Sequence, residues 1–82
     1  MTLDELKEND SAQIVQILDE QLEESLLNMG FIVGEDVTLD RIAPLKDPIL
    51  ITSGLNYISI RKDDAKKILI KKLIKTEFIN NK

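Results

Sequence analysis

The fold depends on the stretch LLNMGFIVGEDV, which covers residues 26–37 and contains two glycines four positions apart. A phosphate-binding P-loop has the pattern G-x-x-x-x-G-K-[ST] and leads from a strand into a helix. Here a helical pattern ends at Gly30 and a strand pattern follows Gly34, with no Gly-Lys-Ser/Thr. Glycine suits the left-handed backbone after a helix end or in a turn. We therefore interpret Gly30 and Gly34 as structural turns.

A helix is predicted before these glycines, over about residues 20–29. Asp19 can cap it, because an aspartate side chain accepts hydrogen bonds from the first amides of a helix. At helical spacing one apolar stripe is predicted to face the core, and it consists of Leu22, Leu26 and Met29. Leu27 does not join this stripe. At about 100° per residue it lies on the acidic, solvent-facing side, among Glu20, Glu23 and Glu24.

After Gly34 the chain is predicted to form short strands bounded by turn residues, over 36–43, 48–53 and 56–61. Gly54 lies in the tight turn that joins the last two of them. Asp63 and Asp64 can cap a single helical turn, and residues 68–74 form either a fifth strand or a helix. Five short strands and one helix favour a small, closed, strongly bent barrel.

The first predicted strand, residues 11–18, changes phase midway. Its apolar residues alternate in one phase at Ala12 and Ile14, and in the other at Val15 and Ile17. Such a change indicates a bulge or bend, which a strongly curved sheet needs. The preceding segment, LDELKEND, is predicted to form a short polar turn.

The composition excludes several classes of function. The 82 residues are predicted to form one domain, and they include no cysteine and no histidine. This excludes disulfides, thiolate nucleophiles and imidazole bases, so we expect no enzyme and no cofactor. There is no apolar run of the roughly 20 residues that a membrane helix needs. The acidic N-terminus lacks the features of a signal peptide, and we therefore expect a cytoplasmic protein.

Charge is distributed unevenly along the chain. Residues 1–40 hold eleven acids and one base, and residues 41–82 hold ten bases and four acids, which gives −10 and +6 and sums to the net charge of −4. This asymmetry indicates either an interaction surface in the basic half or attraction between the two halves in the fold. Few aromatic residues and an acidic pI make nucleic-acid binding a weak hypothesis.

The acidic clusters and one basic stretch are candidate binding sites. The acidic clusters lack the spacing of a calcium loop, so no metal site is predicted, although an Fe(II) sensor or carrier using these carboxylates remains an alternative. The basic stretch at 66–75 has the pattern of a membrane-surface helix if it is helical, and of an alternating strand if it is extended. Peripheral membrane contact through it is therefore a further alternative, and its lysines are Lys66, Lys67, Lys71, Lys72 and Lys75.

Three segments in order, LLNMGFIVGEDV, APLKDPILI and GLNYISIRKDDAKKI, resemble the FeoA family, ferrous iron transport protein A. The resemblance covers about residues 2–72. The matching positions are Leu26, Met29, Gly30, Gly34, Val37, Ala43, Pro44, Asp47, Pro48, Ile58, Ile60, Arg61, Ala65 and Ile68. The sequence departs from the family pattern at Val33, where the family has proline, and at Lys46, where glycine is frequent. The tail at 73–82 carries no family information.

The resemblance implies a single domain over 1–82, an SH3-like barrel of about five strands with one α-helix inserted after the first. It also implies a cytoplasmic accessory protein of bacterial ferrous iron uptake, whose partner is the cytoplasmic part of the FeoB membrane transporter. The same domain type occurs at the C-terminus of iron-dependent repressors. This chain shows no DNA-binding part, so a stand-alone role as a non-enzymatic modulator is expected.

Apolar residues near the helix end are predicted to contact the partner. These are Leu27, with Leu26 and Phe31, and a loop expected beside them that contains Pro44, Leu45 and Pro48. Leu27 is the strongest candidate because its helical angle gives it no core to fill. Gly30, Gly34 and Gly54 are assigned to turns. Weak self-association through an exposed strand edge is a further expectation.

Overall fold

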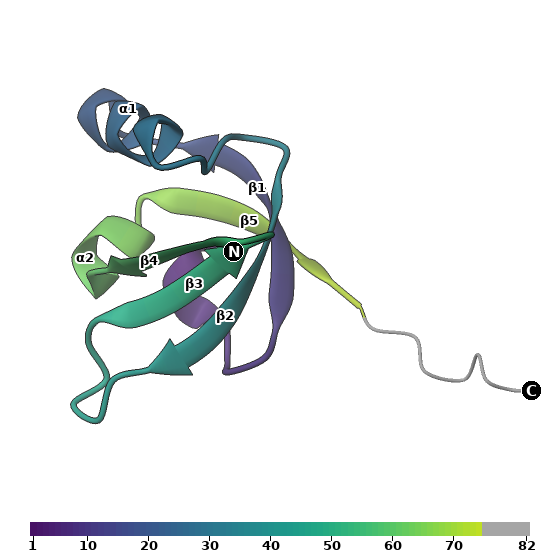
Figure 1. Cartoon of the computed structure of the whole chain (residues 1–82), viewed down its shortest axis with the longest axis vertical. Helices are drawn as coiled ribbons and strands as arrows, with labels where there is room; N and C mark the ends of the chain where they lie inside the picture. Colours follow the sequence, from purple (N-terminus) through teal and green to yellow (C-terminus); the bar gives the residue numbers. More distant parts are fainter. Residues whose placement is uncertain (75–82) are drawn as a thin grey trace, which may run out of the picture.

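A computed structural model describes residues 1–74 of the chain, and this part contains five strands and two α-helices (Figure 1). A 3-10 turn, η1, precedes them. In chain order the elements are η1 (Leu3–Glu5), β1 (Ser11–Ile17), α1 (Glu20–Asn28), β2 (Asp36–Ile42), β3 (Ile49–Ser53), β4 (Asn56–Ile60), α2 (Lys62–Ala65) and β5 (Ile68–Leu73). Neither helix among these residues is long and apolar enough to cross a membrane.

The five strands form one antiparallel sheet in the order β4-β3-β2-β1-β5, so β4 and β5 are its edges. The register shifts between Ile14 and Gln16 in β1, which confirms the predicted irregularity. Val15 lies at the shift and is exposed, whereas Ile17 beyond it is buried in the new phase. A second register shift lies in β2 between Leu39 and Arg41. Bulges of this kind let a small sheet bend around its core.

The core lies inside the bent sheet and is wholly apolar. Alternate residues of the strands fill it, and Phe31 enters it from the segment after α1. Leu3 and Leu6 also belong to this core, with 0% and 3% of their surface exposed. The turn predicted at the N-terminus is present as η1, but the prediction that it is polar is wrong, because Leu3 and Leu6 are buried in the core.

The N-terminus also covers part of the β5 edge. Thr2 forms an antiparallel bridge with Leu69, and the amide of Ile70 donates to the carbonyl oxygen of Met1 at 2.9 Å. Residues 68–73 are a strand, so the alternative of a basic helix in this stretch is wrong. Pairing with Met1 and Thr2 gives some of the N–H and C=O groups at the β5 edge hydrogen-bond partners, which buried backbone groups require.

The helical turn predicted at Asp63 and Asp64 exists as α2, but neither aspartate caps it. Its N-cap is Arg61, which makes no side-chain capping bond. The carboxylate of Asp47 instead accepts a hydrogen bond from the amide of Lys62 at 3.0 Å. The cap is therefore supplied from the β2–β3 loop, fifteen residues earlier in the chain.

Candidate partner-binding surface

Helix α1 has the N-cap and the glycine after its end that the sequence predicts, but it ends at Asn28, one residue before the predicted end. Asp19 accepts a hydrogen bond from the amide of Leu22 at 2.9 Å. At the other end, the amide of Phe31 donates to the carbonyl oxygen of Leu26 at 2.8 Å, and that of Gly30 to Leu27 at 3.0 Å. These two bonds form a Schellman motif, in which the residue after the C-cap adopts the left-handed conformation. Gly30 is that residue, and its φ is +88°. The predicted role of Gly30 is confirmed.

The Schellman motif determines which side chains at the helix end reach solvent. Leu26 and Phe31 are 1% and 0% exposed and pack in the core. The sequence predicts that both contact a partner, but in this structure they present almost no surface. Leu26 instead fills the core, as its place in the predicted apolar stripe indicates. Leu27 is 56% exposed, as its helical angle predicts. Met29 was assigned to the buried stripe, yet it is exposed, because the helix ends at Asn28 and Met29 no longer follows the helical rotation.

More apolar side chains are exposed just after the helix. Ile32 and Val33 lie in the segment that leads to Gly34, which turns the chain with φ +96° as predicted. The amide of Gly34 donates to the carbonyl oxygen of Ile14 at 2.8 Å and holds this segment against β1. Four of the seven residues from 27 to 33 are therefore large, apolar and exposed.

The β3–β4 turn lies beside the helix end. A Cβ atom added to Gly30 would lie 2.6 Å from Nδ2 of Asn56, so the side chain of Asn56 packs closely against the backbone of Gly30. The hydroxyl of Ser53 donates to the carboxylate of Glu35 at 2.9 Å. In Figure 1 the segment that leaves α1 runs down to this turn. Leu55 projects from the turn and is 96% exposed.

We call the resulting group the helix-exit surface. It consists of Leu27, Met29, Ile32, Val33 and Leu55. Of these five residues, the sequence predicts only Leu27 to be exposed and to contact a partner. The exposure of Leu55 could have been predicted from the sequence. Polar residues and glycine dominate two-residue hairpin turns, so a large apolar residue there is unusual. Gly54 has the positive φ, +60°, that such a turn requires at its first position.

The loop with the two prolines lies elsewhere. Pro44, Leu45 and Pro48 are exposed, Leu45 to 89%. They follow the last residue of β2, whereas Leu27, Met29, Ile32 and Val33 of the helix-exit surface precede its first. A seven-residue strand separates its ends by about 20 Å, and Figure 1 shows α1 and the β2–β3 loop at opposite ends of the molecule. The prediction that this loop lies beside the helix end is therefore wrong.

The proline loop has a surface groove of its own. The groove has a volume of about 550 Å³ and is lined by Leu6, Lys7, Glu8, Ile42, Ala43, Pro44 and Lys46. The carboxylate of Glu8 accepts a hydrogen bond from the amide of Ile42 at 2.8 Å. Lys46 has φ +75°, the conformation in which glycine is favoured. The backbone at Lys46 therefore has the left-handed conformation that glycine, which is frequent at this position of the family pattern, adopts easily.

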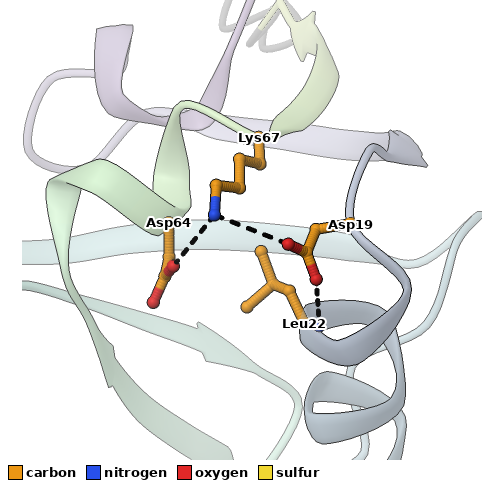
Figure 2. A network of polar contacts seen from close by, with 4 residues as sticks. All are labelled: Asp19, Leu22, Asp64 and Lys67. Atoms are coloured by element: carbon orange, nitrogen blue, oxygen red, sulfur yellow. Dashed lines mark hydrogen bonds and ion pairs between the residues drawn. The ribbon is translucent and has the colours of Figure 1, made fainter.

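The carboxylates are dispersed within the described chain. Across residues 1–74 no group of three or more acidic side chains is arranged to hold a metal ion. Figure 2 shows what two of them do: the ammonium of Lys67 lies 3.5 Å from Asp19 and 4.0 Å from Asp64. The pKa of Asp19 is lowered, first by the hydrogen bond from the Leu22 amide and then by Lys67. This network links the start of α1 to the end of α2.

Two lysines of the basic stretch form ion pairs with aspartates of the acidic half of the chain. Lys72 lies 3.4 Å from Asp10, and Lys67 pairs with Asp19, so both ion pairs join the two halves of the chain. Attraction between the halves is therefore confirmed at these two points. Lys66 and Lys71 are exposed, and Lys75 lies outside the described residues. Membrane contact through the lysines stays a prediction.

The comparisons with known proteins agree with this geometry. The family model for the FeoA domain matches residues 1–72. The chain belongs to the FeoA family. A relative from Porphyromonas gingivalis, an Fe(2+) transport protein A/Fe(2+) transporter FeoB fusion protein, is 36% identical over 69 residues, or 83% of this chain. The chain spans only 8% of the length of that fusion.

Two solved FeoA structures share the fold. The FeoA protein of Chlorobium tepidum has a TM-score of 0.85 at 28% identity, over 94% of this chain and 74% of its own. The FeoA of Stenotrophomonas maltophilia, solved with zinc and described as a prokaryotic SH3 domain protein, has a TM-score of 0.71 at 30% identity, over 87% and 89%. The predicted SH3-like fold, with a helix after the first strand, is confirmed for this FeoA chain.

Proposed function

We propose that this FeoA chain is a non-enzymatic accessory protein of ferrous iron uptake that binds the cytoplasmic part of the FeoB transporter and modulates it. The family and the fusion relative support a shared pathway, because a fusion places a FeoA unit and a FeoB transporter in one molecule. The direction of modulation is an outcome of the experiments below.

The helix-exit surface is the observation that carries the proposed contact. Exposed apolar side chains that gather at one place typically mark a protein–protein interface. Leu27 is 56% exposed, on a helix whose other exposed side chains are polar or acidic. Burying such an anchor against a partner removes apolar area from water, and anchors of this kind carry most of the affinity at interfaces.

We expect Leu27→Glu to weaken binding of the transporter's isolated cytoplasmic domain about tenfold or more, which corresponds to about 1.4 kcal/mol. The fold should be unchanged because Leu27 is exposed. Isothermal titration calorimetry measures the affinity, and ferrous iron uptake in cells that carry only the variant measures the consequence.

Leu45→Glu is the matched control, since it makes the same change at an exposed leucine at the other end of β2. Normal binding by Leu45→Glu together with weak binding by Leu27→Glu supports the helix-exit surface. The reverse result assigns the contact to the proline loop and refutes the role of Leu27. Full binding and full uptake by both variants would contradict both surfaces.

A further inference from the structure

The two edges of the sheet are protected to different degrees. Met1 and Thr2 cover part of the β5 edge, and lysines flank and occupy that strand. The β4 edge, with the sequence NYISI, contains no charge, no proline and no glycine, and its register with β3 is regular. Soluble proteins normally block such edges with charges, prolines or bulges because an open edge can pair with another strand. The described part of the chain has none of these devices on β4.

The register identifies the free backbone groups on β4. Ser53 faces Asn56 across the two-residue turn, so these two residues form a hydrogen-bonded pair. Hydrogen-bonded pairs alternate along an antiparallel ladder, so Ile58 and Ile60 also bond to β3. The N–H and C=O groups of Tyr57 and Ser59 consequently point away from the sheet. Both side chains are exposed on its outer face.

The β4 strand itself carries no charge, and charged residues lie only beyond its ends. Near its start, the Ser53 hydroxyl on β3 bonds to the Glu35 carboxylate, which lies on the β2 side of β3. The sequence RKDD, residues 61–64, follows the end of β4, so opposite charges balance there. The edge therefore carries no charge that would repel an identical strand.

We propose that β4 pairs antiparallel with β4 of a second copy of this chain, about a two-fold axis through Ile58. In this register Tyr57 faces Ser59 of the other copy, and each residue's free N–H group donates to the free C=O group of the other. The two-fold axis generates the same pair a second time. Tyr57 and Ser59 flank Ile58 symmetrically, so the two-fold axis gives each free N–H group a free C=O group as its partner. The uncharged strands bring no like charges together.

The dimer is expected to be weak. Only a short strand is shared, so the buried area falls below the roughly 1,200 Å² of a standard interface. We expect a dissociation constant of about 0.1–1 mM. This self-pairing is independent of the proposed transporter contact, and it is measured with the full chain alone.

Sedimentation velocity and amide hydrogen exchange, from about 0.02 to 1 mM protein, test the pairing. We expect the average mass to rise towards that of a dimer and the amides of Tyr57 and Ser59 to gain protection with concentration. Protection that does not depend on concentration would mean that the edge is covered within one chain, which overturns the proposal. A constant monomer mass also overturns it.

Two double variants test the register. Tyr57→Lys with Ser59→Glu places opposite charges across the two-fold axis, and we expect association about threefold to tenfold tighter. Tyr57→Lys with Ser59→Lys places like charges there, and we expect association to be lost. Both change the same exposed positions, and equal thermal midpoints confirm that both fold. Equal association of the two variants would refute the register.

Discussion

Lys46 is a residue whose backbone conformation conflicts with its side chain. It lies in the β2–β3 loop with φ +75°, and its amide donates to the carbonyl oxygen of Ala43 at 2.7 Å. A left-handed backbone costs a residue with a Cβ atom about 1–2 kcal/mol, and glycine avoids this cost but loses more entropy on folding. The sequence showed lysine at a position where the family often has glycine, but only the structure shows that the backbone shape is retained.

We expect Lys46→Gly to raise the free energy of unfolding by about 0.5–1 kcal/mol. Urea denaturation measures it. Lys46→Ala is the control, because it removes the ammonium and keeps the Cβ atom, and it should give no comparable gain. Equal gains from both substitutions would show that charge, and not backbone strain, is the cause.

Leu27 and Met29 show how far helical periodicity reaches. The 100° rotation per residue placed Leu27 correctly on the exposed side. It failed for Met29, two positions later, because Met29 is already the C-cap, with φ −98° and ψ 6°. Helical periodicity predicts the direction of a side chain only while the backbone remains helical, so the prediction fails at the C-cap.

At the scale of elements, α1 is held by the network around Asp19 (Figure 2). The hydrogen bond from the Leu22 amide lowers the pKa of Asp19 below its ordinary value of 3.8, and Lys67 adds to this. The pKa of Asp10 is lowered in the same way, first by the Lys7 amide and then by Lys72. A carboxylate with a lowered pKa stabilises the fold above pH 3.8, and this stabilisation is lost as pH falls through the folded-state pKa.

We therefore expect thermal stability to fall as the pH drops below about 4, and Asp19→Asn to reduce that fall. Asparagine is as good an N-cap as aspartate but does not titrate, so the cap remains while the pH dependence is lost. Circular dichroism melts across the acidic range measure it. Lys67→Gln should keep most of the pH dependence of stability, because the hydrogen bond from the Leu22 amide is the main cause of the lowered pKa of Asp19. If Lys67→Gln removes as much as Asp19→Asn, the ion pair is the main cause instead.

The α2 turn shows what local sequence cannot reveal about an element. Two aspartates at its start made a local cap the obvious prediction, yet the cap comes from Asp47 in another loop. The same contact joins two of the segments that carry the family resemblance. A capping partner fifteen residues away depends on how β3 and β4 fold back, which no local pattern encodes.

At the scale of the whole molecule, the N-terminus completes the core. Leu3 is fully buried, and η1 packs beside α2 and β5. In a domain of this size one missing core side chain is serious, because total stability is only about 5–15 kcal/mol.

We expect Leu3→Ala to reduce the free energy of unfolding by about 2–5 kcal/mol through the cavity it leaves. Leu27→Ala makes the same change at an exposed leucine, and it should change stability by only about 0.5 kcal/mol or less. Urea denaturation compares them. Similar losses for both variants would contradict the assignment of Leu3 to the core.

The class of fold, the order of strands and helix along the chain, the turns at Gly30, Gly34 and Gly54, and the exposure of Leu27 can all be predicted from the sequence. These features follow from local propensities and periodicity, which act over a few residues. The burial of Phe31, the position of the proline loop at the opposite end of β2, and the place of Leu55 beside the helix end become visible only in the folded chain. Such outcomes depend on which distant segments the bent sheet brings together, and burial and adjacency are properties of that packing.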